Sequence, residues 1–413
     1  MAHAFLDDAA DVHGPPRESF AKLFLRFLRF GLLAWGGPVA QIDMIRQELV
    51  TEEKWVSPSR FKKLLAMYQI LPGPEAHELC VYFGMLARGR IGGILAGLGF
   101  MLPGFLLMFL LSWLYVAYQI TETPMQAVFL GIQPAVIALI FRAAHRIGSH
   151  VLTDRALLVI AVVSGVVDLL GVPFWMTLAV AGLAYLFATQ KRWMVAAVLG
   201  AVLLAGAVTY GPEQKLFKTT QRTGTMQSTV LEGSHTASGS QLFVSGLRAG
   251  LLTFGGAYTA IPFLQRDAVH NGRWMSDGEF LDGVAISGTL PAPLIIFSTF
   301  VGYIGGGALG ALLMTIGVFL PAFCFSLLFH TQLERLMERP LLREVLEGVT
   351  AAVVGIIVST LITLGVGTIT NVKAAAVFVL ALIPLYVWKG KTVIPCVVMG
   401  AGLLGWLLFR SSF

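Results

Sequence analysis

Long apolar runs dominate the sequence, and short polar or glycine- and proline-rich interruptions separate them. The plainest runs are 91–118, 125–141, 192–210, 308–329 and 349–369. A transmembrane helix needs about 20 predominantly apolar residues, and these runs are close to that length. The pattern therefore predicts an all-α polytopic membrane protein.

The runs and their interruptions predict about 13 transmembrane helices. Seven precede residue 211, at 20–40, 60–88, 91–118, 125–145, 155–170, 173–189 and 192–210. Six follow residue 240, at 241–262, 278–304, 308–330, 345–368, 373–388 and 392–409. An alternative topology folds 60–88 and 278–304 back as re-entrant hairpins.

The two halves of the chain repeat one another. At an offset of 219 residues, Arg29 matches Arg248, and "KWVSPSRF" (54–61) falls on "RWMSDGEF" (273–280). The offset shortens to 217 by Gly131 and Gly348, as a duplication with small deletions would produce. We therefore expect four parts: an N-terminal tail (1–19), a first repeat (20–210), a flexible external linker rich in Thr, Ser and Gly (211–240), and a second repeat (241–413).

The number of helices and the charges predict that the repeats are inverted. Seven crossings before the linker is an odd number, so the second repeat would enter the membrane from the opposite side. Thirteen crossings place eighteen Lys and Arg on the N-terminal side and ten on the other, against twelve and sixteen for the re-entrant alternative. Basic loops stay in the cytoplasm, which puts the N-terminus there and favours thirteen crossings. Five basic residues within 46–63 are an exception, because this topology places them outside.

Composition and charge agree with a membrane protein and exclude other classes. The chain is 56% apolar and 13% charged, whereas soluble domains carry about a quarter charged residues. The net charge of +6 is explained by basic cytoplasmic loops, so no nucleic-acid partner is expected. The three cysteines lie in apolar segments without metal-like spacing, and we expect neither a metal nor a cofactor.

Two pairs of interruptions occupy equivalent places in the repeats. Gly36-Gly37-Pro38 corresponds to Gly255-Gly256, and Pro72-Gly73-Pro74 corresponds to Pro291-Ala292-Pro293. Backbone breaks at membrane depth are tolerated only where they face protein or a water-filled cavity. Pro74 and Pro293 are expected to begin half-helices near mid-membrane, whose N-termini attract anions. Paired breaks of this kind are typical of transporters whose site lies between inverted repeats. Close packing of glycines is the alternative.

Four ionisable residues are candidates for the same site. Arg29 and Arg248 lie two helical turns before their glycine pairs, and arginine offers bidentate donors to oxyanions. Snorkelling to the membrane surface is the alternative for both. Glu75 and Glu78 have no acidic counterparts in the second repeat, which makes them candidates for proton coupling. Stabilisation by the helix dipole is the alternative for these carboxylates.

Together these residues resemble the chromate ion transporter family in its long, two-domain form. The resemblance is carried by "FGLLAWGGPVAQIDMIR", "LPGPEAHELCVYFG", "GRIGGILAGLGFMLPGF", "LTFGGAYTAIPFL", "GRWMSDGEFLDGVAISGTLPAPLIIFSTFVGY" and "LPAFCFSLL". It covers both repeats. It implies a multi-pass protein of the prokaryotic plasma membrane that exports chromate and confers chromate resistance, with sulfate as the chemical look-alike.

The expected function is therefore chromate export by alternating access. The expected substrate-binding residues are Arg29, Gly36, Gly37, Pro38, Pro72, Gly73, Pro74, Arg248, Gly255, Gly256, Pro291 and Pro293. Proton antiport is compatible with export but not required, because a dianion leaving a negative interior gains about 4.6 kcal/mol per 100 mV. A sulfate uptake or exchange carrier and a membrane-embedded transferase are the alternatives. The bilayer and a chromate- or sulfate-like dianion are the expected partners, and a homo-oligomer is compatible with the sequence.

Overall fold

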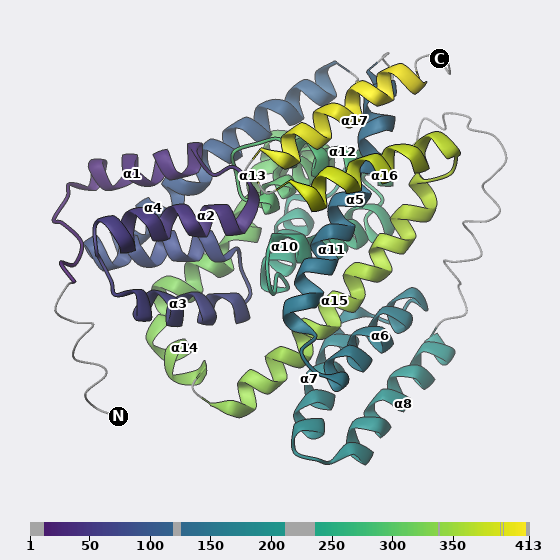
Figure 1. Ribbon diagram of the computed structural model, residues 1–413, viewed down its shortest axis with the longest axis horizontal. Coiled ribbons are helices and arrows are strands. Elements are labelled where there is room, and N and C mark those ends of the chain that lie inside the picture. The colour runs from purple at the N-terminus through teal and green to yellow at the C-terminus, as the bar shows by residue number, and fades with distance from the viewer. Residues whose placement is uncertain are drawn as a thin grey trace. The chain divides into compact units, whose positions relative to one another are not determined.

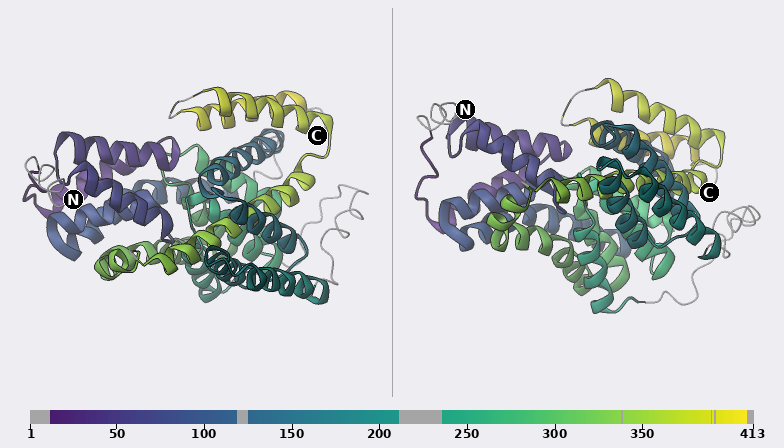
Figure 2. Two further views of the ribbon diagram at one scale, coloured as in Figure 1. Left: turned by 60° about the horizontal axis from the view of Figure 1, so that its bottom comes forward. Right: turned by 90° about the horizontal axis from the view of Figure 1, so that it is seen from below.

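The computed structural model describes residues 12–118, 125–210, 236–337, 339–388, 390 and 392–409 (Figure 1). Within these residues all regular secondary structure is helical, and no strand is present (Figure 2). The predicted linker lies outside the described residues except for 236–240, and so does most of the predicted N-terminal tail.

Four helical segments of the described chain are long and apolar enough to cross a membrane. They are α4 (Glu75–Ala117), α5 (Gln126–Val151), Leu294–Leu328, which joins η6 (Leu294–Ile296) to α13 (Phe297–Leu328), and α15 (Pro340–Thr368). Shorter apolar helices are α7 (Phe174–Thr189), α16 (Val372–Val387) and α17 (Val393–Phe409). The prediction of an all-helical polytopic membrane protein is confirmed.

The chain divides into two compact units, and each combines segments from both halves of the sequence. The first unit takes its residues from 1–132, 236–334 and 387–413. The second takes its residues from 133–235 and 335–386. The candidate site residues all belong to the first unit.

The second unit is a helical cluster around α15. Both α6 (Arg155–Leu169) and α7 approach this helix at glycines, with Gly355 against the carbonyl of Ala161 and Gly348 against that of Ala181. The helix α8 (Trp193–Tyr210) belongs to the same unit. A polar contact also joins these elements, because the Ser359 hydroxyl donates to Asp168 at 2.7 Å. Small residues therefore bring the helices together, as is usual in membranes.

The first repeat begins with a helical hairpin that we call the first hairpin (20–52). Its outward arm is α1 (Phe20–Leu32), and its return arm is α2 (Gly37–Arg46) followed by the π-helix η2 (Gln47–Glu52). The chain reverses at Gly36 and Gly37. An ion pair between the arms proves the reversal, because Arg29 of α1 contacts Glu48 of η2, 19 residues further along the chain.

The second hairpin (58–87) follows directly. Its arms are α3 (Pro58–Ile70) and residues 75–87 of α4, which has non-helical dihedral angles at Arg88 and Gly89. The rings of Phe61 and Phe83 stack with centroids 6.4 Å apart, so the two arms lie side by side. The chain therefore turns back at Pro72–Pro74.

The second repeat begins with two equivalent hairpins. The third hairpin (239–271) consists of α10 (Gly239–Leu251), η4 (Ala257–Ala260), α11 (Ile261–Gln265) and the π-helix η5 (Arg266–Asn271). The fourth hairpin (277–305) pairs α12 (Asp277–Gly288) with η6 and the first arm of α13, which is interrupted at Gly306 and Gly307. Phe280 and Phe297 meet across it with ring centroids 5.6 Å apart. The helix α14 (His330–Met337) follows α13.

These hairpins differ from the preferred count of thirteen crossings. That count gives one crossing each to 20–40, 60–88, 241–262 and 278–304, and the structure turns the chain back within or just after each of these segments. Arm length explains the difference, because a helix of 13 residues such as α1 is only about 20 Å long and the hydrocarbon core is about 30 Å thick. The re-entrant alternative for 60–88 and 278–304 describes these two segments better.

The long second arms of α4 and α13 support the hairpins. A Cβ at Gly31 of α1 would lie 2.4 Å from the carbonyl oxygen of Phe100 in α4. A Cβ at Gly250 of α10 would lie 2.3 Å from the carbonyl oxygen of Val318 in α13. Both repeats therefore use glycine to seat the outward arm of the first or third hairpin against a long helix.

Candidate functional site at the hairpin tips

The glycine pairs form the tips of the first and third hairpins. Gly36 and Gly37 have φ angles of 89° and 78°, and Gly255 and Gly256 have φ angles of 74° and 120°. These left-handed conformations favour glycine. A Cβ at Gly37 or Gly256 would meet no heavy atom within 4 Å, so the backbone conformation and not lack of space requires glycine there. Pro38 occupies the first turn of α2.

The prolines form the tips of the second and fourth hairpins. Pro74 directly precedes α4, and Pro293 directly precedes η6, so each proline is followed by a new helix, as expected from the sequence. Gly73, between Pro72 and Pro74, has a φ angle of 150°. Between Pro291 and Pro293, Ala292 replaces glycine and packs against Gly104 of α4.

The second and third tips are joined by backbone pairing. Pro72 and Phe254 form an isolated antiparallel β-bridge. The Gly73 N–H donates to the Thr253 carbonyl oxygen at 2.8 Å. A break in the first repeat therefore satisfies its backbone through a break in the second, within the same compact unit.

Capping side chains distinguish the bases of the hairpins from their tips. The helices at the four bases start at Ser19, Ser57, Ser238 and Ser276, and each serine oxygen accepts from a backbone N–H three residues on. Glu279 completes a capping box after Ser276. The helices at the four tips start after Gly36, Pro74, Gly256 and Pro293, and no side chain caps them. The tips therefore present helix N-termini that a bound anion could cap.

Two carboxyl groups lie at the second tip. Glu78 is fully buried, and neither of its carboxyl oxygens has a hydrogen-bond partner. A Cβ at Gly73 would lie 2.9 Å from the Glu78 carboxyl carbon, which places this group against the tip backbone. Glu75, one turn earlier in α4, is 6% exposed. The corresponding positions in the second repeat are Leu294 and Phe297.

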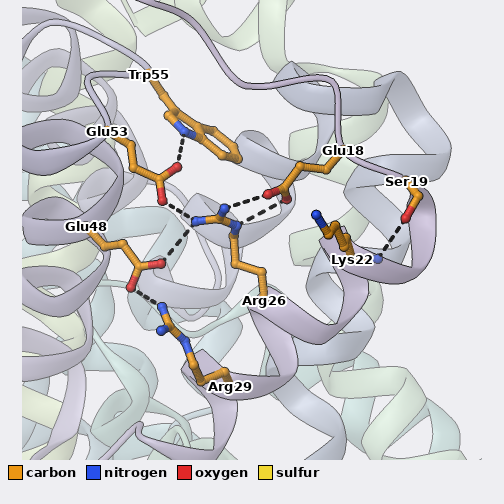
Figure 3. Close-up of polar contacts among 8 residues, drawn as sticks. All are labelled: Glu18, Ser19, Lys22, Arg26, Arg29, Glu48, Glu53 and Trp55. Atoms are coloured by element: carbon orange, nitrogen blue, oxygen red, sulfur yellow. Dashed lines mark hydrogen bonds and ion pairs between the residues drawn. The ribbon is translucent and has the colours of Figure 1, made fainter.

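The predicted site arginines lie in the last turn of the outward arms, α1 and α10, and the side chain of each pairs with an acid on the return arm of its own hairpin. Figure 3 shows Glu48 between Arg29 and Arg26, which also contacts Glu18 and Glu53. Burial raises the pKa of Glu48 above its ordinary value, although Arg29 and Arg26 act in the opposite direction.

The third hairpin has a smaller version of this arrangement. Arg248 contacts Asp267 at 3.2 Å, and the exposed fractions of their side chains are 45% and 9%. Ser245 and Asn271 also donate to Asp267. Among the described residues no contact joins Arg248 to Arg29, so the structure does not bring the two arginines together.

Sequence reasoning missed the acids that pair with these arginines. Glu48 and Asp267 are separated by the repeat offset of 219, the same offset that relates Arg29 and Arg248. That shared offset was the available signal. A buried acid of the fourth hairpin, Asp282, was also missed. It accepts a hydrogen bond from Tyr115 at 2.8 Å.

Comparison with known proteins identifies related chains. A sequence model described as chromate transporter matches residues 21–208 and 240–406. A chromate transport protein of Pseudomonas aeruginosa is 54% identical over 98% of this chain and 96% of its own length. One of Cupriavidus metallidurans is 30% identical over 96% of this chain and 95% of its own length. A probable chromate transport protein of Synechococcus elongatus is 28% identical over 98% of this chain and its own full length. No solved structure matches.

Proposed function

Because the chain belongs to the chromate transporter family, we propose that it exports chromate from the cytoplasm by alternating access at the hairpin tips. The observation that carries the proposal is the pairing of the second tip with the third, through the Pro72–Phe254 bridge. Breaks from the two repeats meet there, as they do in transporters whose site lies between inverted repeats. Membership of a transporter family sets aside the membrane-embedded transferase.

The proposed topology has nine crossings and four hairpins that enter the membrane and return. The crossings are residues 90–117 of α4, then α5, α6, α7, α8, residues 308–328 of α13, α15, α16 and α17. Five of these precede the linker, so the repeats stay inverted. The first two hairpins enter from the cytoplasm, and the last two enter from outside.

The charges support this topology. Of the 29 lysines and arginines in the sequence, 21 fall on the N-terminal side and eight on the other. The eight are Lys215, Lys218, Arg222, Arg248, Arg266, Arg273, Lys373 and Arg410. The basic residues within 46–63 move to the cytoplasmic side, which removes the exception that thirteen crossings left. The proposed location is the plasma membrane of a prokaryotic cell, with the N-terminus in the cytoplasm.

In this proposal the tips hold the dianion. The binding residues are Gly36, Gly37 and Pro38 of the first tip, Pro72, Gly73 and Pro74 of the second, Gly255 and Gly256 of the third, and Pro291 and Pro293 of the fourth. Uncapped helix N-termini supply backbone N–H groups and the positive ends of helix dipoles. Arg29 and Arg248 act two helical turns before the glycine tips, where each exchanges its acid for the passing anion.

Glu78 is the proposed proton carrier of the second tip. Buried carboxyl groups in membrane proteins commonly mark proton pathways, and Glu78 has no hydrogen-bond partner to fix its charge state. Its contact with Gly73 places it where a dianion would bind. Protonation there would change the charge that the anion meets, which couples the two ions.

The test is chromate flux into everted membrane vesicles, normalised to the amount of protein. We expect wild-type vesicles to accumulate chromate, and sulfate to compete if the site recognises tetrahedral dianions in general. We expect Glu78→Gln to flatten the dependence of flux on pH, with Glu75→Gln as the matched control of smaller effect. Vesicles that accumulate sulfate but not chromate would support the sulfate carrier instead. An unchanged pH profile in Glu78→Gln would remove Glu78 from proton coupling.

A further inference from the structure

A cavity at the base of the third hairpin takes no part in the proposed tip site. Its volume is about 230 Å³, and it is lined by Gln241, Ser245, Arg248, Asp267, Asn271 and Trp274, among others. Four residues of α10 line the cavity, Gln241, Val244, Ser245 and Arg248, and they share one face of the helix because they are three, four and seven residues from the first. A tetrahedral oxyanion with several waters fits this volume, since a water molecule occupies about 30 Å³.

The first repeat fills the equivalent place with a side chain of its own. Ser245 corresponds to Arg26, and Trp274 corresponds to Trp55. The Arg26 guanidinium lies over the Trp55 ring, 5.6 Å from its centroid, and contacts three carboxylates (Figure 3). In the third hairpin the short Ser245 replaces this arginine, and the cavity is the space that the longer side chain would fill.

The acids that would hold a cation in this cavity are missing. Glu18 and Glu53 of the first repeat correspond to Ala237 and Gly272. Asp267 remains, but each of its carboxylate oxygens already accepts two hydrogen bonds. Oδ1 accepts from Arg248 and Asn271, and Oδ2 accepts from Arg248 and Ser245. A carboxylate has about four lone-pair sites, so no acceptor is left for a cation.

Hydrogen-bond donors remain. The Arg248 guanidinium binds Asp267 through Nη1 only, which leaves Nε and Nη2 to a ligand. Trp274 is 5% exposed, and its indole N–H is buried without a hydrogen-bond partner. In the first repeat the equivalent Trp55 N–H donates to Glu53 at 2.8 Å. The Gln241 amide adds a further donor on the cavity wall.

We propose that this cavity is a second oxyanion site, which binds a tetrahedral dianion such as sulfate or chromate through Arg248 and Trp274. The binding site is inferred from the cavity and its donors alone, whereas its role in export rests on the proposed function. In the proposed topology it lies on the external side, and the first repeat has no equivalent because Arg26 fills that place. The transporter would then hold an exported anion in a cavity at its exit, whereas its entrance offers the anion only the exchange at Arg29.

The test is equilibrium binding of radiolabelled sulfate to the purified full-length protein in lipid nanodiscs, with chromate as competitor. We expect two sulfates per chain. Trp274→Phe should weaken one of them about tenfold, the loss expected for one hydrogen bond to a charged ligand. It should lower the melting temperature less than Trp55→Phe does, because the smaller ring costs packing in both but the N–H that Trp274→Phe removes has no partner. Ser245→Leu, which fills the cavity, should remove the same sulfate.

Matched variants separate this site from the tip site. Trp55→Phe should leave both sulfates bound and lower the melting temperature, because it deletes a formed hydrogen bond. Gly256→Leu should remove the other sulfate. Wild-type sulfate binding in both Trp274→Phe and Ser245→Leu would overturn the second site, and if Gly256→Leu then lost sulfate the tip site would stand. A single sulfate that is lost in Trp274→Phe but kept in Gly256→Leu would establish the cavity and overturn the tips.

Discussion

The bases of the first and third hairpins show how one duplicated structure acquires two electrostatic characters. Both keep an arginine on the outward arm and an acid on the return arm, Arg29 with Glu48 and Arg248 with Asp267. The first hairpin adds Arg26 and surrounds it with carboxylates. The third replaces Arg26 with Ser245 and opens a cavity. The pair common to both repeats joins the arms of each hairpin, and the first base has three more ion pairs, all through Arg26.

The largest loss of stability is expected from removing Arg26, the central charge at the base of the first hairpin. Arg26→Ser leaves Glu18 and Glu53 beside Glu48 without their shared cation, and because these side chains are partly buried the loss should be about 2–3 kcal/mol. Arg248→Ser should cost about 1 kcal/mol, because Ser245 and Asn271 still donate to Asp267. The measurement is thermal unfolding of both purified variants in detergent.

A compensated variant sharpens this comparison. Adding Glu18→Ala and Glu53→Gly to Arg26→Ser reproduces the residues of the third hairpin. The triple variant should recover most of the lost stability, because the unpaired carboxylates are gone. If it is less stable than Arg26→Ser alone, the first base is held by packing of these side chains and not by charge balance.

An intermediate effect, equal in the two repeats, is expected where α1 and α10 contact their long helices. Gly31→Ala and Gly250→Ala place a Cβ within 2.4 Å of a backbone carbonyl oxygen, which forces the helices apart. Such overpacking costs about 1–3 kcal/mol. Melting temperatures of the two variants should fall together. A large fall in one variant only would show that the two repeats are seated differently.

The smallest effect on stability is expected at the open tips, where only the backbone conformation requires glycine. Gly37→Asn should retain most of the chromate flux, because asparagine tolerates the left-handed region, whereas Gly37→Val should lose about 1–2 kcal/mol of stability and most of the flux. Gly256, with a φ angle of 120°, should tolerate neither residue. The measurement is flux per folded protein. Equal flux in the asparagine and valine variants at Gly37 would mean that this tip does not need its left-handed turn.

The positions of the breaks could be predicted from the sequence, but the direction of the chain after each break could not. Glycine pairs and Pro-x-Pro mark where a helix must stop, and the structure breaks at both. A broken crossing and a hairpin have the same composition, so hydropathy does not separate them. The basic residues within 46–63 were the signal for a hairpin, since they return to the cytoplasmic side only if the chain turns back.

The acids that pair with Arg29 and Arg248 could not be predicted for the same reason. Arg29 and Glu48 are far apart along a continuous helix, and only a hairpin brings them into contact. The pairing of the second tip with the third was equally invisible, because it joins two repeats through backbone atoms that carry no residue-type signal. By contrast, Ser57 and Ser276 each precede a helical run in the sequence and cap it in the structure, so these N-caps can be predicted because capping is a local interaction.

The bridge between Pro72 and Phe254 also has a consequence for biosynthesis. The first repeat leaves the ribosome while the acceptor for its Gly73 N–H, the Thr253 carbonyl, has not yet been translated. Until then this donor has no partner from the second repeat, and an unmet backbone donor in a lipid environment costs several kcal/mol. The second hairpin therefore reaches its final state only after the third hairpin has been made, and the nascent first repeat stays incomplete until the second arrives.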